Sequence, residues 1–220
     1  MDKKLIIWDF DGVIADTESL LVSVKMNAVN KYLGLNWDFV TTHKILGGIS
    51  DKDKQRVLAK MGIVVDDDFW VKITNKCNYD ALLSDVKITP NIIDIFNMKN
   101  FDQCIATGGA YKITEKKLKK TGVDKYFDKK DIFTIDLVDY GKPAPDLFLL
   151  AAKTKGYKPE DCFVIEDSKA GLTAAIRAEM TPIAFVKYNS DYINNEIKKL
   201  GIKNIFYDMN DIKSFLINNL

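Results

Sequence analysis

Two aspartates, Asp9 and Asp11, stand two positions apart where an apolar run ends in the stretch IIWDFDGV. Carboxylates this close repel each other, and a cation, a proton or solvent must offset the repulsion. A second acidic pair, Glu166 and Asp167, follows another apolar run. Any one of these acids could simply cap a helix, but two acidic clusters that both follow apolar runs favour a divalent cation. Hard oxygen ligands completed by water and phosphate suit Mg²⁺.

Two further segments offer groups that could bind a phosphate. Thr107, in IATGGA, supplies a hydroxyl, and Gly108 and Gly109 allow backbone N–H groups to face an anion where the next helix begins. A Thr-Gly turn alone is a weak signal, because glycine often marks no more than a tight bend. Lys142 stands in GKPAPD, where the prolines restrict the backbone. Most isolated lysines lie on the surface, but beside an acidic cluster Lys142 is the expected cation.

The charges of this set predict how the two aspartates divide the chemistry. With all four acids ionised, one magnesium ion and one lysine leave a net charge of −1, which would repel a phosphate dianion. A proton on Asp11 brings the net charge to zero. We therefore predict that Asp11 holds a proton in the resting complex and acts as the general acid, while Asp9 is held by magnesium and attacks.

These residues need a scaffold that brings them together, and the apolar pattern predicts one. Six short apolar runs are separated by longer stretches, at 5–8, 103–106, 132–135, 162–165, 183–186 and 204–207. Such runs predict the parallel strands of a doubly wound, Rossmann-like α/β sheet. Ligands of these sheets bind beyond the carboxyl ends of the strands. The segments DFDG, ATGG, YGKPAPD and IEDSKAG are therefore expected at one edge of the sheet.

The connection between the first and second runs spans roughly ninety residues, far more than a crossover helix requires. Its periodicity is mostly helical, which predicts a helical cap domain over 16–86 and an α/β core made of 1–15 and 87–220.

Three helices are expected in the insertion. The first has Thr17 as its N-cap and Gly34 as its stop, and the other two cover about 52–61 and about 69–83.

Two connecting segments also carry expectations. Where the chain re-enters the core, Thr89 is expected to cap a helix that Pro90 starts. The segment Gly47, Gly48, Ile49 and Ser50 is predicted as a cap loop over the site that sets specificity, since its glycines permit motion and close approach.

The composition is that of an ordinary globular protein of 220 residues, 47% hydrophobic, with 32 Lys and Arg against 31 Asp and Glu. No global field favours nucleic acid or an anionic membrane, and the lysine-rich stretch 112–120 is interpreted as a solvated helix face. No run suggests a signal sequence or a membrane span, so we expect a cytoplasmic location. We also expect a monomer. Cys77, Cys104 and Cys162 suggest neither disulfides nor zinc, and the single histidine, His43, is expected at the surface or in a loop.

DFDGV, IATGG, GKPAPD and VIEDSKAG, in this order, resemble the four motifs of the haloacid dehalogenase superfamily. The likeness is greatest to its phosphatase and β-phosphoglucomutase-like branch, which inserts a helical cap after the first motif. The resemblance implies that Asp9 is a nucleophile that forms an aspartyl-phosphate and that Asp11 acts as acid and then base. It also implies that Thr107 and Lys142 clamp the phosphoryl group.

The same resemblance implies a magnesium site. Its ligands would be the Asp9 carboxylate, the Asp11 backbone carbonyl and Asp167, with Glu166 nearby or acting through water. Gly108 departs from the pattern, because relatives often carry Asn or Ser there, and phosphate binding would then rest on backbone donors.

The function implied is a magnesium-dependent phosphomonoester phosphatase for a small phosphorylated metabolite, with a sugar phosphate expected. A β-phosphoglucomutase-type phosphosugar mutase is the first alternative. Gly47 and Asp51 stand about where mutases carry cap cations, which weakens it, and Lys52, Lys54 and Arg56 fit a solvated helix face. A receiver-like signalling domain is the second alternative. Its phosphorylated aspartate follows a later strand, and it lacks a helical insertion.

Overall fold

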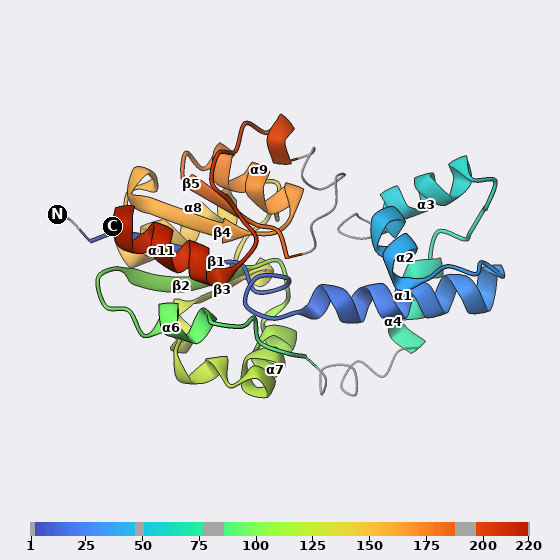
Figure 1. Cartoon of the computed structure of the whole chain (residues 1–220), viewed down its shortest axis with the longest axis horizontal. Coiled ribbons are helices and arrows are strands. Elements are labelled where there is room, and N and C mark those ends of the chain that lie inside the picture. The colour runs from blue at the N-terminus through green and yellow to red at the C-terminus, as the bar shows by residue number, and fades with distance from the viewer. Residues whose placement is uncertain (1–2, 47–50, 77–85, 188–196, 220) are drawn as a thin grey trace. The chain divides into compact units, whose positions relative to one another are not determined.

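The computed structural model describes residues 3–46, 51–76, 86–187 and 197–219. The chain divides into two compact units, one formed by Met1–Asp16 with Lys87–Leu220 and the other by Thr17–Val86. We call them the sheet unit and the helical unit (Figure 1). The segment 47–50, predicted as a specificity loop, lies outside the described residues.

The sheet unit is built on six parallel strands in the order β3-β2-β1-β4-β5-β6. In chain order they are β1 (Leu5–Trp8), β2 (Asp102–Thr107), β3 (Ile132–Thr134), β4 (Cys162–Glu166), β5 (Thr181–Phe185) and β6 (Ile205–Phe206). β1 pairs with both β2 and β4, so that Trp8 lies opposite Ile105 on one side and Ile165 on the other. This register brings the carboxyl ends of β1, β2 and β4 to one edge, and the predicted α/β sheet is confirmed.

Helices flank the sheet (Figure 1). They are α6 (Ile92–Phe96), α7 (Tyr111–Thr121), α8 (Asp146–Lys155), α9 (Lys169–Arg177) and α11 (Met209–Asn219), with short 3-10 turns at Val123–Lys125, Lys129–Asp131, Ile135–Leu137 and Pro159–Asp161. Leu5 and Ile7 pack into a core cluster with α8 and α9. On alternate positions, Trp8 meets Phe96 of α6 edge to face, with ring centroids 5.4 Å apart. Burial on both faces explains the unbroken apolar run of β1.

Two of the three cysteines lie in this core. Cys104 and Cys162 are buried in β2 and β4, in the same cluster as α8 and α9. They behave as the small buried hydrophobes that the sequence predicted. Cys77 lies outside the described residues.

The helical unit comprises α1 (Thr17–Leu33), α2 (Phe39–Leu46), α3 (Asp51–Lys60) and α4 (Phe69–Lys76). Val29, Leu46, Leu58 and Trp70 form its own buried core. The third predicted helix is described only as far as residue 76. Among the described residues of both units, no helix has the length and hydropathy to cross a membrane.

Helix α2 was not predicted, and His43, expected at the surface or in a loop, lies in this helix. His43 lies half-buried in α2, and its ring stacks on that of Phe39 with centroids 6.2 Å apart. The helix has only eight residues, too few for its periodicity to stand out from a loop.

The predicted caps at the junctions were also wrong. α1 begins at Thr17 itself, and among the described residues the Thr17 hydroxyl has no hydrogen-bond partner. α6 begins at Ile92 after Asn91, and the buried Thr89 hydroxyl donates to the Val13 carbonyl at 2.6 Å. Thr89 therefore joins the returning chain to the segment after β1 instead of capping a helix.

Candidate active site

Asp9 directly follows β1 and is nearly buried. Its backbone N–H donates to the Ile165 carbonyl at 3.0 Å, so that the pairing with β4 continues one residue beyond the strand. Oδ1 of its carboxylate accepts a hydrogen bond from Lys142 Nζ at 2.6 Å. Asp9 is therefore held at both its backbone and its side chain.

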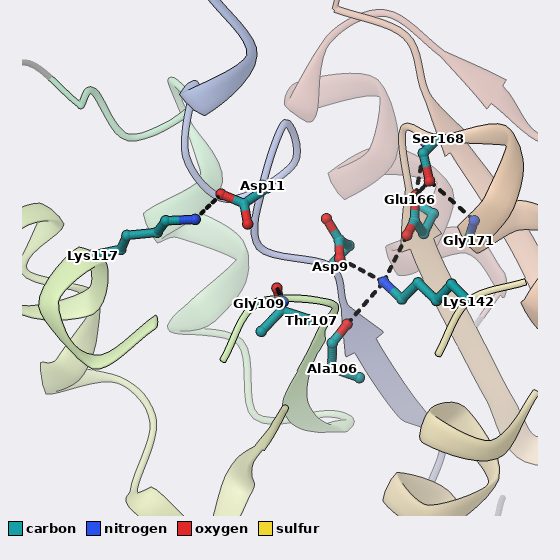
Figure 2. A network of polar contacts seen from close by, with 10 residues as sticks. All are labelled: Asp9, Asp11, Ala106, Thr107, Gly109, Lys117, Lys142, Glu166, Ser168 and Gly171. Atoms are coloured by element: carbon teal, nitrogen blue, oxygen red, sulfur yellow. Dashed lines mark hydrogen bonds and ion pairs between the residues drawn. The ribbon is translucent and has the colours of Figure 1, made fainter. Parts of the chain in front are cut away.

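Lys142 connects its own segment to the other three predicted segments (Figure 2). Its Nζ donates to Asp9 Oδ1, to Glu166 Oε1 at 2.7 Å and to the Ala106 carbonyl at 3.1 Å. The side chain is 9% exposed, and its ammonium lies 4.8 Å from the centre of the Phe148 ring. All three donor hydrogens can thus be satisfied by protein oxygens.

Glu166 is the most enclosed of these acids. Its Oε1 accepts from Lys142, and its Oε2 accepts from the Ser168 backbone N–H at 2.8 Å and from the Ser168 hydroxyl at 2.9 Å. A Cβ added to Gly171 of α9 would lie 1.7 Å from Glu166 Oε1. The carboxylate therefore occupies space that only a glycine at position 171 leaves free.

Asp167 is placed by another close approach. Gly12, in the loop after Asp9, has φ +88°, and a Cβ added there would lie 1.8 Å from Asp167 Oδ2. Any other residue at position 12 would be strained and would displace this carboxylate. The DFDG and IEDS segments are therefore fitted to each other.

The acidic cluster matches the needs of a hard cation. Carboxylate oxygens of Asp9, Glu166 and Asp167 lie within 4.8 Å of one another. A donor set made only of oxygen suits Mg²⁺. Because both oxygens of Glu166 already accept from Lys142 or Ser168, Asp9 and Asp167 are the better direct ligands.

Burial and charge shift the proton affinities in this cluster. Burial raises the pKa of Asp9 to about 7, Lys142 opposes the rise, and Glu166 and Asp11 add to it. For Lys142, burial acts to lower the pKa, but Asp9 and Glu166 outweigh it and hold the pKa above its ordinary value. Lys142 is therefore a permanent cation beside a carboxyl group that can change its charge near neutral pH.

The loop after β2 carries the predicted phosphate-binding groups. Thr107 is buried, and its Oγ1 accepts from the Gly109 backbone N–H at 3.2 Å, while Gly108 is exposed. The Tyr111 backbone N–H at the start of α7 donates to Asp136 Oδ2 at 2.6 Å. These contacts hold the loop at the same sheet edge as Asp9, because β2 is paired with β1.

Sequence reasoning missed one charged residue of the site. Lys117 of α7 is nearly buried, and its Nζ lies 2.5 Å from Asp11 Oδ1 (Figure 2). The interpretation of this part of 112–120 as solvated was wrong, because Thr114, Lys117 and Leu118 form the buried face of α7. Their i, i+3, i+4 spacing was the signal that could have found Lys117.

Lys117 also changes the charge count. With two lysines and one magnesium ion, the four ionised acids reach a net charge of zero, so that the count no longer requires a proton on Asp11. Among the described residues, the Asp11 carboxylate is not part of the acidic cluster, since its Oδ1 lies against Lys117.

Known proteins are similar to this chain in sequence and in fold. Residues 6–185 match the family model described as haloacid dehalogenase-like hydrolase. Fructose-1-phosphate phosphatase YqaB from Escherichia coli K12 is 28% identical over 180 residues, which cover 81% of this chain and 94% of that protein. A phosphorylated carbohydrates phosphatase from Thermotoga maritima is 26% identical over 176 residues, covering 78% and 80%. The crystal structure of a haloacid dehalogenase-like protein of unknown function from Agrobacterium tumefaciens gives a TM-score of 0.88 with 25% identity, covering 98% of both chains.

The fold and the site combine a parallel α/β sheet with an acidic cluster at its carboxyl edge. The chain belongs to the haloacid dehalogenase-like hydrolase family. The relatives from Escherichia coli and Thermotoga maritima are named phosphatases, and the predicted enzyme class, a phosphoric monoester hydrolase, is confirmed. This membership speaks against the receiver-like alternative.

Proposed function

We propose that this protein is a magnesium-dependent phosphatase that transfers the phosphoryl group of a small phosphorylated sugar or similar metabolite to Asp9 and then to water. The observation that carries the proposal is the contact of Asp9 with Lys142 inside the cluster that Glu166 and Asp167 complete. The proposed nucleophile, a fixed cation and oxygen ligands for a metal then lie close together, beside the loop of Thr107 and Gly108.

Asp9 and Asp167 would hold the magnesium ion, with the Asp11 backbone carbonyl as a further ligand and Glu166 behind them. When bound, the ion neutralises charge on the transferring phosphoryl oxygens and on the Asp9 carboxylate. Lys142 contributes a second positive charge that Asp9 and Glu166 fix in place.

In the first step, an Asp9 oxygen attacks phosphorus, the bond between phosphorus and the ester oxygen breaks, and protonated Asp11 gives its proton to the departing alcohol. In the second step, water attacks the phosphorus of the aspartyl-phosphate while Asp11 takes a proton from that water. The bond to Asp9 then breaks and inorganic phosphate leaves. The Thr107 hydroxyl and the backbone at Gly108 hold the phosphoryl oxygens during both steps, and the nearby positive charge of Lys142 stabilises them.

The substrate class rests on the relatives, one named for fructose 1-phosphate and one for phosphorylated carbohydrates. We assign the helical unit as the cap that selects among such substrates, with the segment Gly47–Ser50 as its specificity loop. This assignment predicts that substitutions in 47–50 change the preference among sugar phosphates more than they change the hydrolysis of a small aryl phosphate.

The test measures phosphate release with Mg²⁺ from 4-nitrophenyl phosphate and from a panel of sugar phosphates. Asp9→Asn is expected to abolish turnover, and Asp124→Asn, at an exposed acid of the same unit, is the matched control. Labelled phosphate should be trapped on the wild type as a hydroxylamine-sensitive acyl phosphate. Turnover by Asp9→Asn at the wild-type rate would overturn the proposal.

The mutase alternative is tested in the same panel. Glucose 1-phosphate with a bisphosphate activator is expected to yield inorganic phosphate and no isomerised sugar phosphate. Isomerisation faster than phosphate release would show that the protein is a mutase and not a phosphatase.

A further inference from the structure

Asp11 exchanges a proton in the proposed reaction, but the role of its contact with Lys117 is a separate question. The Lys117 side chain is 6% exposed, whereas that of Asp11 is 34% exposed. The ammonium also lies 5.9 Å from the centre of the Phe10 ring, one residue before Asp11. Helix α7 therefore buries a charge against the loop that carries both catalytic aspartates of the proposed reaction.

The two oxygens of Asp11 face different groups. Oδ1 lies 2.5 Å from Lys117 Nζ. Oδ2 lies 3.9 Å from the point where a Cβ of Gly109 would stand, and Thr107 Oγ1 lies 3.6 Å from the same point. Figure 2 shows Asp11 between Lys117 and the Thr107–Gly109 loop. One oxygen is thus bound by the lysine, and the other is directed toward the groups proposed to hold phosphate.

A gain in stability alone does not explain why this ion pair is present. Burying an ammonium group removes its hydration, and a buried ion pair is often no more stabilising than apolar residues of the same size. The apolar face of α7 could have continued through position 117 with a leucine or methionine. A lysine at this position does what an apolar residue cannot, because it fixes the direction of one carboxylate.

We propose that Lys117 is the positioning residue for Asp11, holding its Oδ1 so that Oδ2 faces the ester oxygen of the substrate. This inference rests on the proposed function, in which Asp11 exchanges a proton with that oxygen. Lys117 acts on the reaction through the Asp11 carboxylate that it contacts.

Substrates with different leaving groups distinguish a positioning role of Lys117 from a purely structural one. An alkoxide of a sugar is a poor leaving group and requires the proton of Asp11, whereas 4-nitrophenolate is a stable anion and departs without it. The value of kcat/KM reports the steps up to the departure of the alcohol. Loss of the correct Asp11 orientation should therefore lower kcat/KM for a sugar phosphate and hardly lower it for 4-nitrophenyl phosphate.

The experiment compares Lys117→Gln and Lys117→Arg with Lys120→Gln, an exposed lysine on the same helix. The two esters are 4-nitrophenyl phosphate and the sugar phosphate that the wild type hydrolyses fastest. We expect Lys117→Gln to lower kcat/KM about 30-fold or more for the sugar phosphate and less than about 3-fold for the aryl ester, given that proton transfer contributes about 10²–10⁴-fold. Lys117→Arg should recover part of the loss, and Lys120→Gln should leave both esters unchanged.

A double variant completes the test. In an Asp11→Asn background, Lys117→Gln should lower kcat/KM for the sugar phosphate by less than about 3-fold more, because Lys117 acts through Asp11. Equal losses for both esters, no loss for either, or additive losses in the double variant would overturn the positioning role while the phosphatase stands. So would failure of both Lys117 variants to fold, since the pair would then serve stability. A wild type that hydrolyses no ester of the panel would overturn the proposed function itself.

Discussion

Two buried lysines lie at this sheet edge, and their surroundings differ. Lys142 donates to three oxygens on three segments, and its partners Asp9 and Glu166 are at least as buried as it is. Lys117 has a much more exposed partner, the Asp11 carboxylate. In the proposed reaction, the first lysine would be a fixed part of the charge that binds phosphate, and the second would orient a group that must stay accessible. Burial of the partner, more than burial of the lysine, separates the two roles.

The largest effect is expected from Lys142→Met. The substitution leaves Asp9 and Glu166 buried without their cation, which should lower the free energy of unfolding by about 3–5 kcal/mol. It should also lower kcat by about 10²–10³-fold, as the loss of a preorganised donor does. Urea unfolding and phosphate release measure the two, with exposed Lys153→Met as the control. A fall in kcat of less than tenfold would contradict the comparison.

Gly171→Ala is expected to disturb Lys142 indirectly, through Glu166. The added methyl group would overlap Glu166 Oε1, and moving that carboxylate would break its bonds with Lys142 and Ser168. We expect a loss of about 1–3 kcal/mol in the free energy of unfolding, the usual range for overpacking. Ala170→Ser, at the exposed neighbouring position of α9, should be neutral by the same measurement. Full stability of Gly171→Ala would show that Glu166 can move without cost.

The Asp9 carboxyl, with its pKa raised from 3.8 to about 7, predicts a dependence on pH. Between these pH values, Asp9 keeps its proton in the folded metal-free chain but has lost it in the unfolded chain. The neutral Asp9 therefore favours the folded state, and this stabilisation is lost as pH rises through about 7. Bound magnesium requires the ionised form. Its apparent affinity should therefore fall about tenfold per pH unit below about 7.

Thermal unfolding with and without MgCl₂ at pH 5.5 and pH 8 measures this effect. The stabilisation by magnesium should be larger at pH 8, and Asp9→Asn should remove the difference between the two pH values. An equal shift at both pH values in the wild type would sink the prediction.

The smallest effect is expected from Lys117→Met on stability. Water can solvate the partly exposed Asp11 carboxylate after the lysine is removed, so that the free energy of unfolding should fall by about 1 kcal/mol. Exposed Lys120→Met serves as the control. A loss as large as that of Lys142→Met would remove the distinction between the two lysines.

Sequence patterns predicted those parts of the molecule that depend on local spacing. All six strands were located within two residues at each end, because each is a short apolar run. Lys142 could be placed beside the acids because its segment follows a strand and a cation was needed there. The partner of Lys117 could not be predicted, since a lysine-rich stretch does not show which of its lysines faces a carboxylate and which face water. Its direction depends on how α7 packs against the loop after β1.

The junctions failed for a related reason. Thr89 has the residue type of a helix cap, but its hydroxyl binds the Val13 carbonyl, which is 76 positions away in the chain. Local propensity cannot predict a choice between a nearby N–H group and a distant carbonyl.

The two chain segments that leave and re-enter the sheet unit are paired with each other. Ala15 forms an antiparallel bridge with Ile88, the Asp16 backbone N–H donates to the Lys87 carbonyl at 2.9 Å, and the Thr89 backbone N–H donates to the Ile14 carbonyl at 2.9 Å. This paired stem, residues 14–16 and 87–89, holds the two ends of the insertion together by hydrogen bonds within the sheet unit. Grafting a different module onto the stem at Asp16 and Lys87 should therefore exchange substrate preference among relatives without rebuilding the chemistry beneath.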